Sequence, residues 1–241
     1  MGSYVFIIIG FIAVYAGIFI WYRRKKQQSA AAFSQLNMQQ EAGRAEHYKA
    51  EFLNGDFAFL KKHIKDNPID AFTVATLDYG KGDMAKDVAK DALKSIATLG
   101  TVKYNTVQTP KYLVLSGSDL HLLDTNTDGD VDKHLIFDNF RLQNSTIEEM
   151  PPAKVAAMRI NYGDYSLKNY KVSLQTDGKE VKLVIPNGIV QAMVAQASAT
   201  SMLSNNVEKQ VKEFVLGNYF LNKLGEKAPN LKVQTYLPTQ N

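Results

Sequence analysis

The feature that most constrains this chain is an uncharged apolar run near its start, followed at once by four basic residues. The run from Tyr4 to Trp21 reads YVFIIIGFIAVYAGIFIW, and Arg-Arg-Lys-Lys follows Tyr22. Eighteen helical residues rise about 27 Å, which is close to the thickness of the hydrocarbon core of a bilayer. Because the charges follow the run instead of preceding it, a cleaved signal peptide is disfavoured. The sequence therefore predicts a retained transmembrane helix, with a buried core helix as the alternative.

The expected anchor combines aromatic ends, a face of small residues and a basic block. Aromatic residues are typical of membrane interfaces, and small residues three or four apart permit close helix packing. By the positive-inside rule, the basic block predicts a single-pass protein with its N-terminus outside and its C-terminal domain in the cytoplasm. The block also suits anionic lipid headgroups. The expected anchor residues are Tyr4, Gly10, Ala13, Gly17, Trp21, Tyr22, Arg23, Arg24, Lys25 and Lys26.

The rest of the chain is electrically neutral and contains no cysteine. The net charge of +4 equals the charge of the basic block, so the remaining acids and bases balance. The absence of cysteine excludes disulfides, thiolate metal sites and cysteine nucleophiles. Basic residues outside the block are interleaved with acids, and no zinc finger or RNA-binding aromatic motif is present, so no nucleic-acid partner is expected.

The pattern along the chain predicts four regions. Apolar residues recur at helical spacing after the basic block, with a break near Asn54-Gly55, and a second helix is expected to begin at Asp83. Strand patterns then take over, and a last amphipathic helix is expected from Val207 to about Leu224. The regions are a transmembrane anchor with its basic block at 1–26, a helical stalk at 27–100, a β domain with a C-terminal helix at 101–225, and an extended tail at 226–241.

Two hairpins in the β domain can be aligned by their turn residues. An Asp128-Gly129 turn places Leu122 opposite Leu135 and Leu120 opposite Phe137. An Asp177-Gly178 turn places Leu174 opposite Val181, Val172 opposite Leu183 and Tyr170 opposite Ile185. Both registers gather apolar residues on one side, as a half-buried antiparallel sheet requires. The expected strands are 102–108, 111–116, 119–125, 130–138, 140–147, 157–163, 168–176 and 179–185.

The segment KYLVLSGSDLHLLDTNTDGDVDKHLIFDNFRL resembles the strand run of bacterial pleckstrin-homology and GRAM-type domains. The resemblance covers residues 101–225 and implies an α+β fold. In that fold, the transmembrane helix and stalk precede an antiparallel pleckstrin-homology-like β-barrel or sandwich closed by the C-terminal amphipathic helix. Another small barrel or an α+β sandwich is the alternative. The family implies a binding or scaffolding module. Only Lys103 and Lys111 lie near the first strand–strand loop, which disfavours phosphoinositide recognition.

An acidic stretch matches the spacing of an EF-hand calcium loop. Its oxygen-bearing residues alternate, and Gly129 stands at the bend. The final glutamate ligand is missing, because Leu135 occupies its position, and strands flank the loop. A hairpin turn with solvated acids is therefore favoured over a weak calcium site. The candidate ligands are Asp124, Asn126, Asp128, Asp130 and Asp132.

The four histidines lack a metal-binding motif. His47, His63, His121 and His134 form no HExxH pattern. The predicted register places His121 and His134 diagonally on one face, where a carboxylate could complete a metal site. Structural histidines on a half-exposed sheet are the favoured interpretation. No catalytic residues are expected, because no nucleophile elbow or acid–base pair is present.

These observations predict a non-catalytic, membrane-anchored adaptor or structural subunit that presents a β domain on the cytoplasmic face. Its expected partners are the lipid bilayer and other membrane-protein subunits, and no cofactor beyond weakly bound calcium is expected. The alternatives are a lipid-headgroup or calcium-responsive binding module and an enzyme with an unrecognised site.

Overall fold

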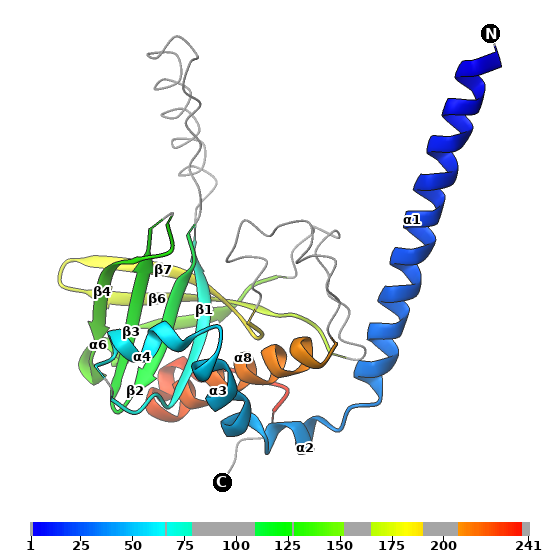
Figure 1. Cartoon of the computed structure of the whole chain (residues 1–241). Coiled ribbons are helices and arrows are strands. Elements are labelled where there is room, and N and C mark those ends of the chain that lie inside the picture. The colour runs from blue at the N-terminus through cyan, green and yellow to red at the C-terminus, as the bar shows by residue number, and fades with distance from the viewer. Residues whose placement is uncertain are drawn as a thin grey trace, which may run out of the picture.

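The computed structural model describes residues 2–65, 67–78, 109–126, 128–151, 165–189 and 207–237. The chain forms a long N-terminal helix that projects from a folded body made of a curved antiparallel sheet and several helices (Figure 1). We use "the body" for the described residues from Phe33 to Leu237. The predicted strands 102–108 and 157–163 and the helix expected from Asp83 lie outside the described residues.

Helix α1 (Gly2–Ser34) does not stop at the basic block but continues through it for eight further residues after Lys26. Within the described residues, no helix has the length and apolarity needed to span a membrane. The predicted transmembrane anchor, the single-pass membrane location and the resulting topology are therefore wrong.

Three short helices follow α1; the first two contact the C-terminal helix, and aromatic residues at the start of the third contact the sheet. The three helices are α2 (Met38–Ala42), α3 (Ala45–Asn54) and α4 (Ala58–His63), and the predicted break at Asn54-Gly55 separates the last two. The Phe57 ring centroid lies 4.9 Å from that of Phe72, and the Phe59 ring centroid lies 4.9 Å from that of Tyr112. These rings join the start of α4 to the sheet, so this part of the predicted helical stalk at 27–100 belongs to the body.

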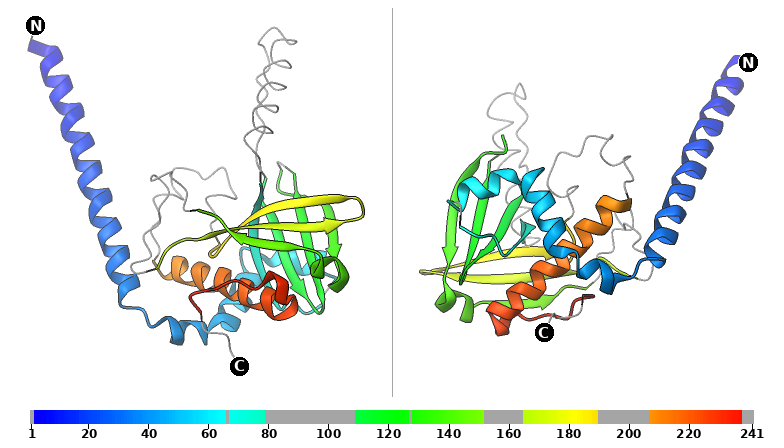
Figure 2. Two further views of the ribbon diagram at one scale, coloured as in Figure 1. Left: turned by 180° about the vertical axis from the view of Figure 1, so that it is seen from behind. Right: turned by 60° about the horizontal axis from the view of Figure 1, so that its bottom comes forward.

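The sheet is open and has seven antiparallel strands in the order β4-β3-β2-β1-β7-β6-β5. The central strand β1 occupies a region predicted to be helical, and its neighbours β2 and β7 come from distant parts of the sequence. Strand β4 also contacts β6 across the curve of the sheet (Figure 2). The expected β-barrel or sandwich is wrong, since the described strands form one open sheet with β4 and β5 as its edges. The strands are β1 (Ala71–Leu77), β2 (Lys111–Ser116), β3 (Asp119–Thr125), β4 (Val131–Phe137), β5 (Thr146–Glu149), β6 (Asn169–Thr176) and β7 (Lys179–Pro186).

Both predicted hairpin registers are confirmed. Leu122 lies opposite Leu135 in β3–β4, and Leu174 lies opposite Val181 in β6–β7. The β3–β4 connection is longer than a two-residue turn, because the register shifts by one residue between Asp124 and Thr125. The predicted strand 140–147 is wrong at its start. There, α6 (Asn139–Gln143) begins with the Asp138 side chain accepting a hydrogen bond from the Arg141 amide at 2.9 Å.

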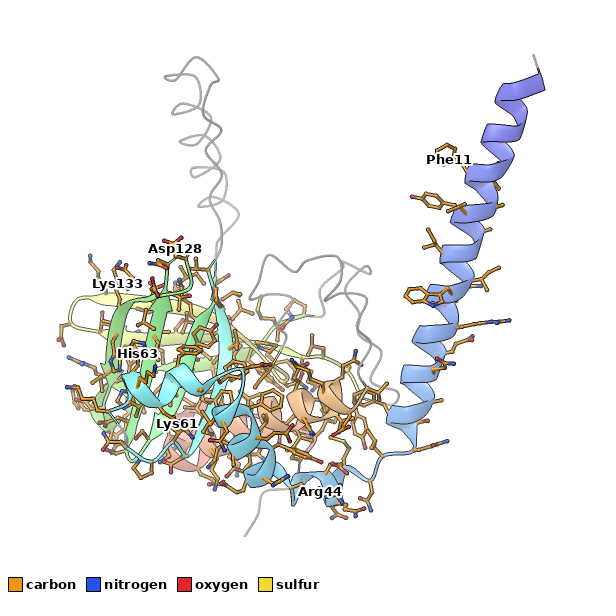
Figure 3. The ribbon with its side chains drawn as sticks, in the orientation of Figure 1. Phe11, Arg44, Lys61, His63, Asp128 and Lys133 are labelled. Carbon is orange, nitrogen blue, oxygen red and sulfur yellow. The ribbon has the colours of Figure 1, made fainter. Side chains whose placement is uncertain are left out.

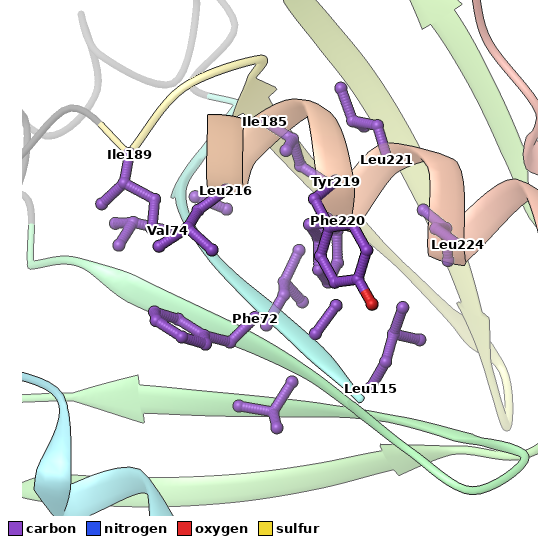
Figure 4. Close-up of a cluster of buried hydrophobic side chains, with 14 of the residues drawn as sticks. Phe72, Val74, Leu115, Ile185, Ile189, Leu216, Tyr219, Phe220, Leu221 and Leu224 are labelled. Carbon is purple, nitrogen blue, oxygen red and sulfur yellow. The ribbon is translucent and has the colours of Figure 1, made fainter. Parts of the chain in front are cut away.

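The last helix, α8 (Val207–Lys227), contacts β1 and β2 and buries every residue from Phe214 to Leu221 (Figure 4). Phe214, Phe220, Leu221 and Leu224 are fully buried, and the helix passes the predicted end at Gly225 by two residues. Helix α8 approaches the backbone of Gly188 closely because residue 217 is a glycine. A Cβ on Gly217 would lie 2.4 Å from the Cα of Gly188, so only glycine fits there.

The C-terminal residues lie along the body and are held there by hydrogen bonds. Within η3 (Pro229–Leu231), the side-chain amide of Asn230 donates to the carbonyl oxygens of Leu142 at 2.8 Å and Ser145 at 2.7 Å. The Tyr170 hydroxyl donates to the carbonyl oxygen of Gln234 at 3.1 Å. The predicted extended tail is therefore an ordered strap up to Leu237, which is buried.

Candidate functional site

Most of the exposed large hydrophobic side chains among the described residues lie on α1 (Figure 3). Every residue from Gly10 to Trp21 is exposed, including Phe11 at 70% and Tyr15 at 77%. Since successive helical residues point about 100° apart, this exposure extends around the whole circumference of the helix. A helix that is apolar on all sides is normally enclosed by other apolar groups. The described part of the chain supplies no such cover for this stretch.

The structure places the remaining expected anchor residues along the same helix. A Cβ added to Gly10 or Gly17 would meet nothing within 4 Å, and the Arg23 guanidinium lies 5.2 Å from the centre of the Phe19 ring. Arg24 is exposed. The apolar stretch thus ends in positive charge on the side nearest the body. The side chains of Tyr4, Tyr22, Lys25 and Lys26 lie outside the described residues.

Helix α1 joins the body at a well-defined connection. Phe33, one residue before the helix ends, is fully buried in the core. The Asn37 side chain then caps α2 by accepting hydrogen bonds from the amides of Gln39 at 3.1 Å and Gln40 at 3.3 Å. The inserted aromatic ring and the cap fix where α1 leaves the body.

A cavity of about 710 Å³ lies beside this connection, between α2–α3 and the first half of α8. Its charged groups are mutually paired. Arg44 contacts Glu41 at 3.2 Å, while Lys212 contacts Glu51 and Glu208, each at 2.8 Å. The Tyr48 hydroxyl donates to Glu41, and Lys212 lies 5.6 Å from the centre of the Tyr48 ring. The lining residues are Leu36, Glu41, Arg44, His47, Tyr48, Val207, Glu208, Val211 and Lys212.

The sequence analysis did not single out this cavity. A usable signal was present, because Glu41, Arg44 and Tyr48 recur at spacings of three and four, which suits one face of continuous helix. The partner residues on α8 are more than 150 positions away in the sequence, so their approach depends on the tertiary fold. The paired charges fit a role in holding α2–α3 to α8.

The acidic loop is organised by its own hydrogen bonds. The Asn126 side-chain oxygen accepts from the amides of Asp128 at 2.9 Å and Asp130 at 3.0 Å, and Gly129 has a φ of 91°. Asp124 is paired with Lys111, which is almost fully buried. Two of the five candidate calcium ligands are therefore already engaged. Asp132 lies on β4, and within the described residues no group of three or more histidine, aspartate or glutamate side chains is arranged for a metal. Calcium binding by the loop stays a prediction.

The structure brings two of the four histidines into direct contact. Nδ1 of His121 lies 2.9 Å from Nε2 of His134, across the β3–β4 pair, in the diagonal arrangement that the register predicts. His121 is buried, while His134 is exposed on the edge strand. His63 lies on α4 and His47 on α3.

Comparisons with protein-family models, with curated proteins and with solved structures give no match for this chain. The resemblance to pleckstrin-homology and GRAM-type domains therefore stays a prediction.

Proposed function

We propose that this protein is a non-catalytic subunit or adaptor of a protein assembly, in which apolar helices of partner chains enclose α1. The observation that carries the proposal is the exposure of apolar side chains around the entire circumference of α1 from Gly10 to Trp21. An exposed apolar surface of this kind marks an interaction site. Most large apolar side chains described in the body are buried, with Leu135, Ile136 and Phe140 as exposed exceptions, so α1 carries the most extensive exposed apolar surface.

The charges at the end of this stretch define the chemistry of the partner. Arg23 and Arg24 are both exposed and directly follow the apolar residues. A partner that covers α1 would therefore combine an apolar helical surface with carboxylates near these two guanidinium groups. Arginine forms strong paired hydrogen bonds with carboxylates, which fixes the register of such an interface.

The connection to the body supports an adaptor role. Because Phe33 is buried in the core, Asn37 caps the next helix and α1 contacts α8, the position of α1 is coupled to the body. A partner bound to α1 would hold the body at a fixed place in the assembly. The edge strands β4 and β5 would then remain available to further chains.

Site-specific photo-cross-linking in the native cell tests the proposal. A benzophenone amino acid replaces Phe11 or Ile18 on α1, and a matched variant carries it at Phe140, which is 74% exposed on the body. We expect discrete protein adducts from the α1 positions that are absent from the Phe140 variant. Arg23→Glu with Arg24→Glu should weaken those adducts, whereas Lys61→Glu, on α4, should not. Adducts with lipid alone, or the same diffuse adducts at all three positions, would overturn the proposal.

The tryptophan provides a second readout. Trp21 is the only tryptophan of the chain and is 43% exposed at the end of the apolar stretch. In the purified assembly, its emission should shift to shorter wavelength and resist quenching by iodide. Emission typical of a solvent-exposed indole in the intact assembly would contradict the enclosure of α1.

A further inference from the structure

We propose that the contact between His121 and His134 is an acid-sensitive latch that holds the edge strand β4 against β3. The proposal is independent of the assembly role of α1. It starts from the 2.9 Å distance between Nδ1 of His121 and Nε2 of His134. At this distance, one ring donates its N–H to the unprotonated nitrogen of the other. The ring centroids are 5.1 Å apart, so the side chains are close throughout.

The latch joins a well-covered strand to a poorly covered one. On β3, His121 is 7% exposed and its neighbours Leu120, Leu122 and Leu123 are buried. On β4, five consecutive residues from Asp132 to Ile136 are exposed, and among the described strands β4 pairs only with β3. Strand β4 therefore has little buried side-chain area to hold it against β3. The contact between His134 and His121 accordingly contributes a larger share of the stability of this strand pair.

The surroundings oppose a second proton on the pair. His63 from α4 and Lys65 just beyond it face His134 with positive charge or the capacity for it. Asp119 on β3 acts in the opposite direction on His121, and Asp132, two residues before His134, lies at the register shift of β4. Tyr112 on β2 shares this face and is neutral, since burial raises its pKa. When both imidazoles are protonated, the hydrogen bond is lost and two cations adjoin each other.

The shifts in pKa agree with this arrangement. Burial lowers the pKa of His121, with Asp119 opposing it, and burial followed by the charges of His121, His63 and Lys65 lowers the pKa of His134. A histidine with a lowered pKa in the folded state binds fewer protons there than in the unfolded state. Its stabilising contribution is thus complete above about pH 6.5 and is lost as the pH falls below that value.

Hydrogen exchange of the full chain at about pH 7.5 and about pH 5 tests the latch. After correction for intrinsic exchange rates, we expect the β4 amides to lose at least about tenfold more protection on acidification than those of the β6–β7 hairpin. His134→Gln keeps a side-chain amide near the position of Nε2 but cannot be protonated, so this difference should disappear. His47→Gln, on α3, should leave it unchanged.

Two outcomes would overturn the latch: equal acid-induced loss in the wild type and in His134→Gln, or equal loosening of β4 and the β6–β7 hairpin. If His134→Gln does not fold, the imidazole titrations of the wild type decide by NMR. The latch requires coupled titration of the two rings, with the second proton bound only well below about pH 6.5. Independent titration of both rings near that value would exclude it.

Discussion

Among the described residues, the two longest helices place their side chains in opposite environments. Helix α8 buries every residue from Phe214 to Leu221 in the body, whereas α1 exposes every residue from Gly10 to Trp21. The amphipathic pattern of α8 is enough to predict both its helical form and its buried face. The uniform apolarity of α1 predicts a helix that needs cover, but it contains no face that would identify what provides the cover.

Truncation of a buried α8 side chain should have the largest effect. Phe220 is fully buried, so Phe220→Ala removes a ring from a packed core and should lower the free energy of unfolding by about 3–5 kcal/mol. Urea denaturation monitored by circular dichroism measures this change in free energy. Circular dichroism is used because the single tryptophan lies in α1 and would not report unfolding of the body. Phe140→Ala is the matched control, since Phe140 is 74% exposed and its loss should cost less than about 0.5 kcal/mol. Equal effects of the two changes would contradict the burial of this face.

Replacing a glycine by alanine should affect stability in α8 but not in α1. Gly217→Ala places a Cβ 2.4 Å from backbone atoms of Gly188 and should cost about 2–3 kcal/mol despite the higher helix propensity of alanine. In α1, Gly10→Ala meets nothing within 4 Å and should leave the unfolding of the body unchanged. Both variants are compared by urea denaturation. If Gly217→Ala left the free energy of unfolding unchanged, the close contact between α8 and the backbone of Gly188 would not be required for stability.

The carboxyl group of Glu213 on α8 should make the free energy of unfolding depend on pH. Burial raises the pKa of Glu213 to about 7, with Lys209 lowering it and Asp56 raising it further. The folded state therefore binds more protons than the unfolded state between about pH 4.5 and 7, and this contribution to stability is lost as the pH rises through that window.

The variant Glu213→Gln should accordingly stabilise the protein by about 1 kcal/mol above pH 7 and leave it unchanged near pH 4.5. Urea midpoints at the two pH values measure the difference. Glu208→Gln serves as the control on the same helix, because Glu208 is exposed and paired with Lys212 at 2.8 Å. A gain that is the same at both pH values would rule out titration of Glu213 as its cause.

Polar substitutions on α1 should have the smallest effect on the body. Phe11→Ser and Ile18→Ser replace side chains that are 70% and 59% exposed, so the unfolding free energy of the body should change by less than about 0.5 kcal/mol. Thermal melts of the isolated protein followed by circular dichroism test this. The same changes should weaken the partner adducts of α1. A loss comparable to that of Phe220→Ala would instead place α1 in the core of its own chain.

Local patterns predicted those parts of the sheet that form from adjacent sequence. Both hairpin registers follow from short turns and alternating apolar residues, as the pairs Leu122–Leu135 and Leu174–Val181 show. The cross-strand approach of His121 and His134 follows from the same register. The turn of the acidic loop was less predictable, because the side chain of Asn126 and a register shift lengthen it.

The central strand could not be predicted in the same way. Ala71–Leu77 reads AFTVATL, with no turn joining it to a neighbouring strand, and its partners lie at Lys111–Ser116 and Lys179–Pro186. Its place in the sheet depends on contacts that no local window contains. The cavity beside α1 was missed for the same reason, since Lys212 meets Glu51 only in the tertiary fold.

The position of β1 in the sheet also determines when the body can form during synthesis. The middle strand is the first strand of the described sheet to leave the ribosome, yet the pair Thr76–Val184 joins it to one of the last. The strap at Asn230, which binds Ser145, comes later still. Such distant pairings slow folding, because a long loop must close before the contacts are gained. The apolar α1 is therefore synthesised and exposed well before the body beside it is complete, so in the proposed assembly the partner of α1 can bind it on the nascent chain.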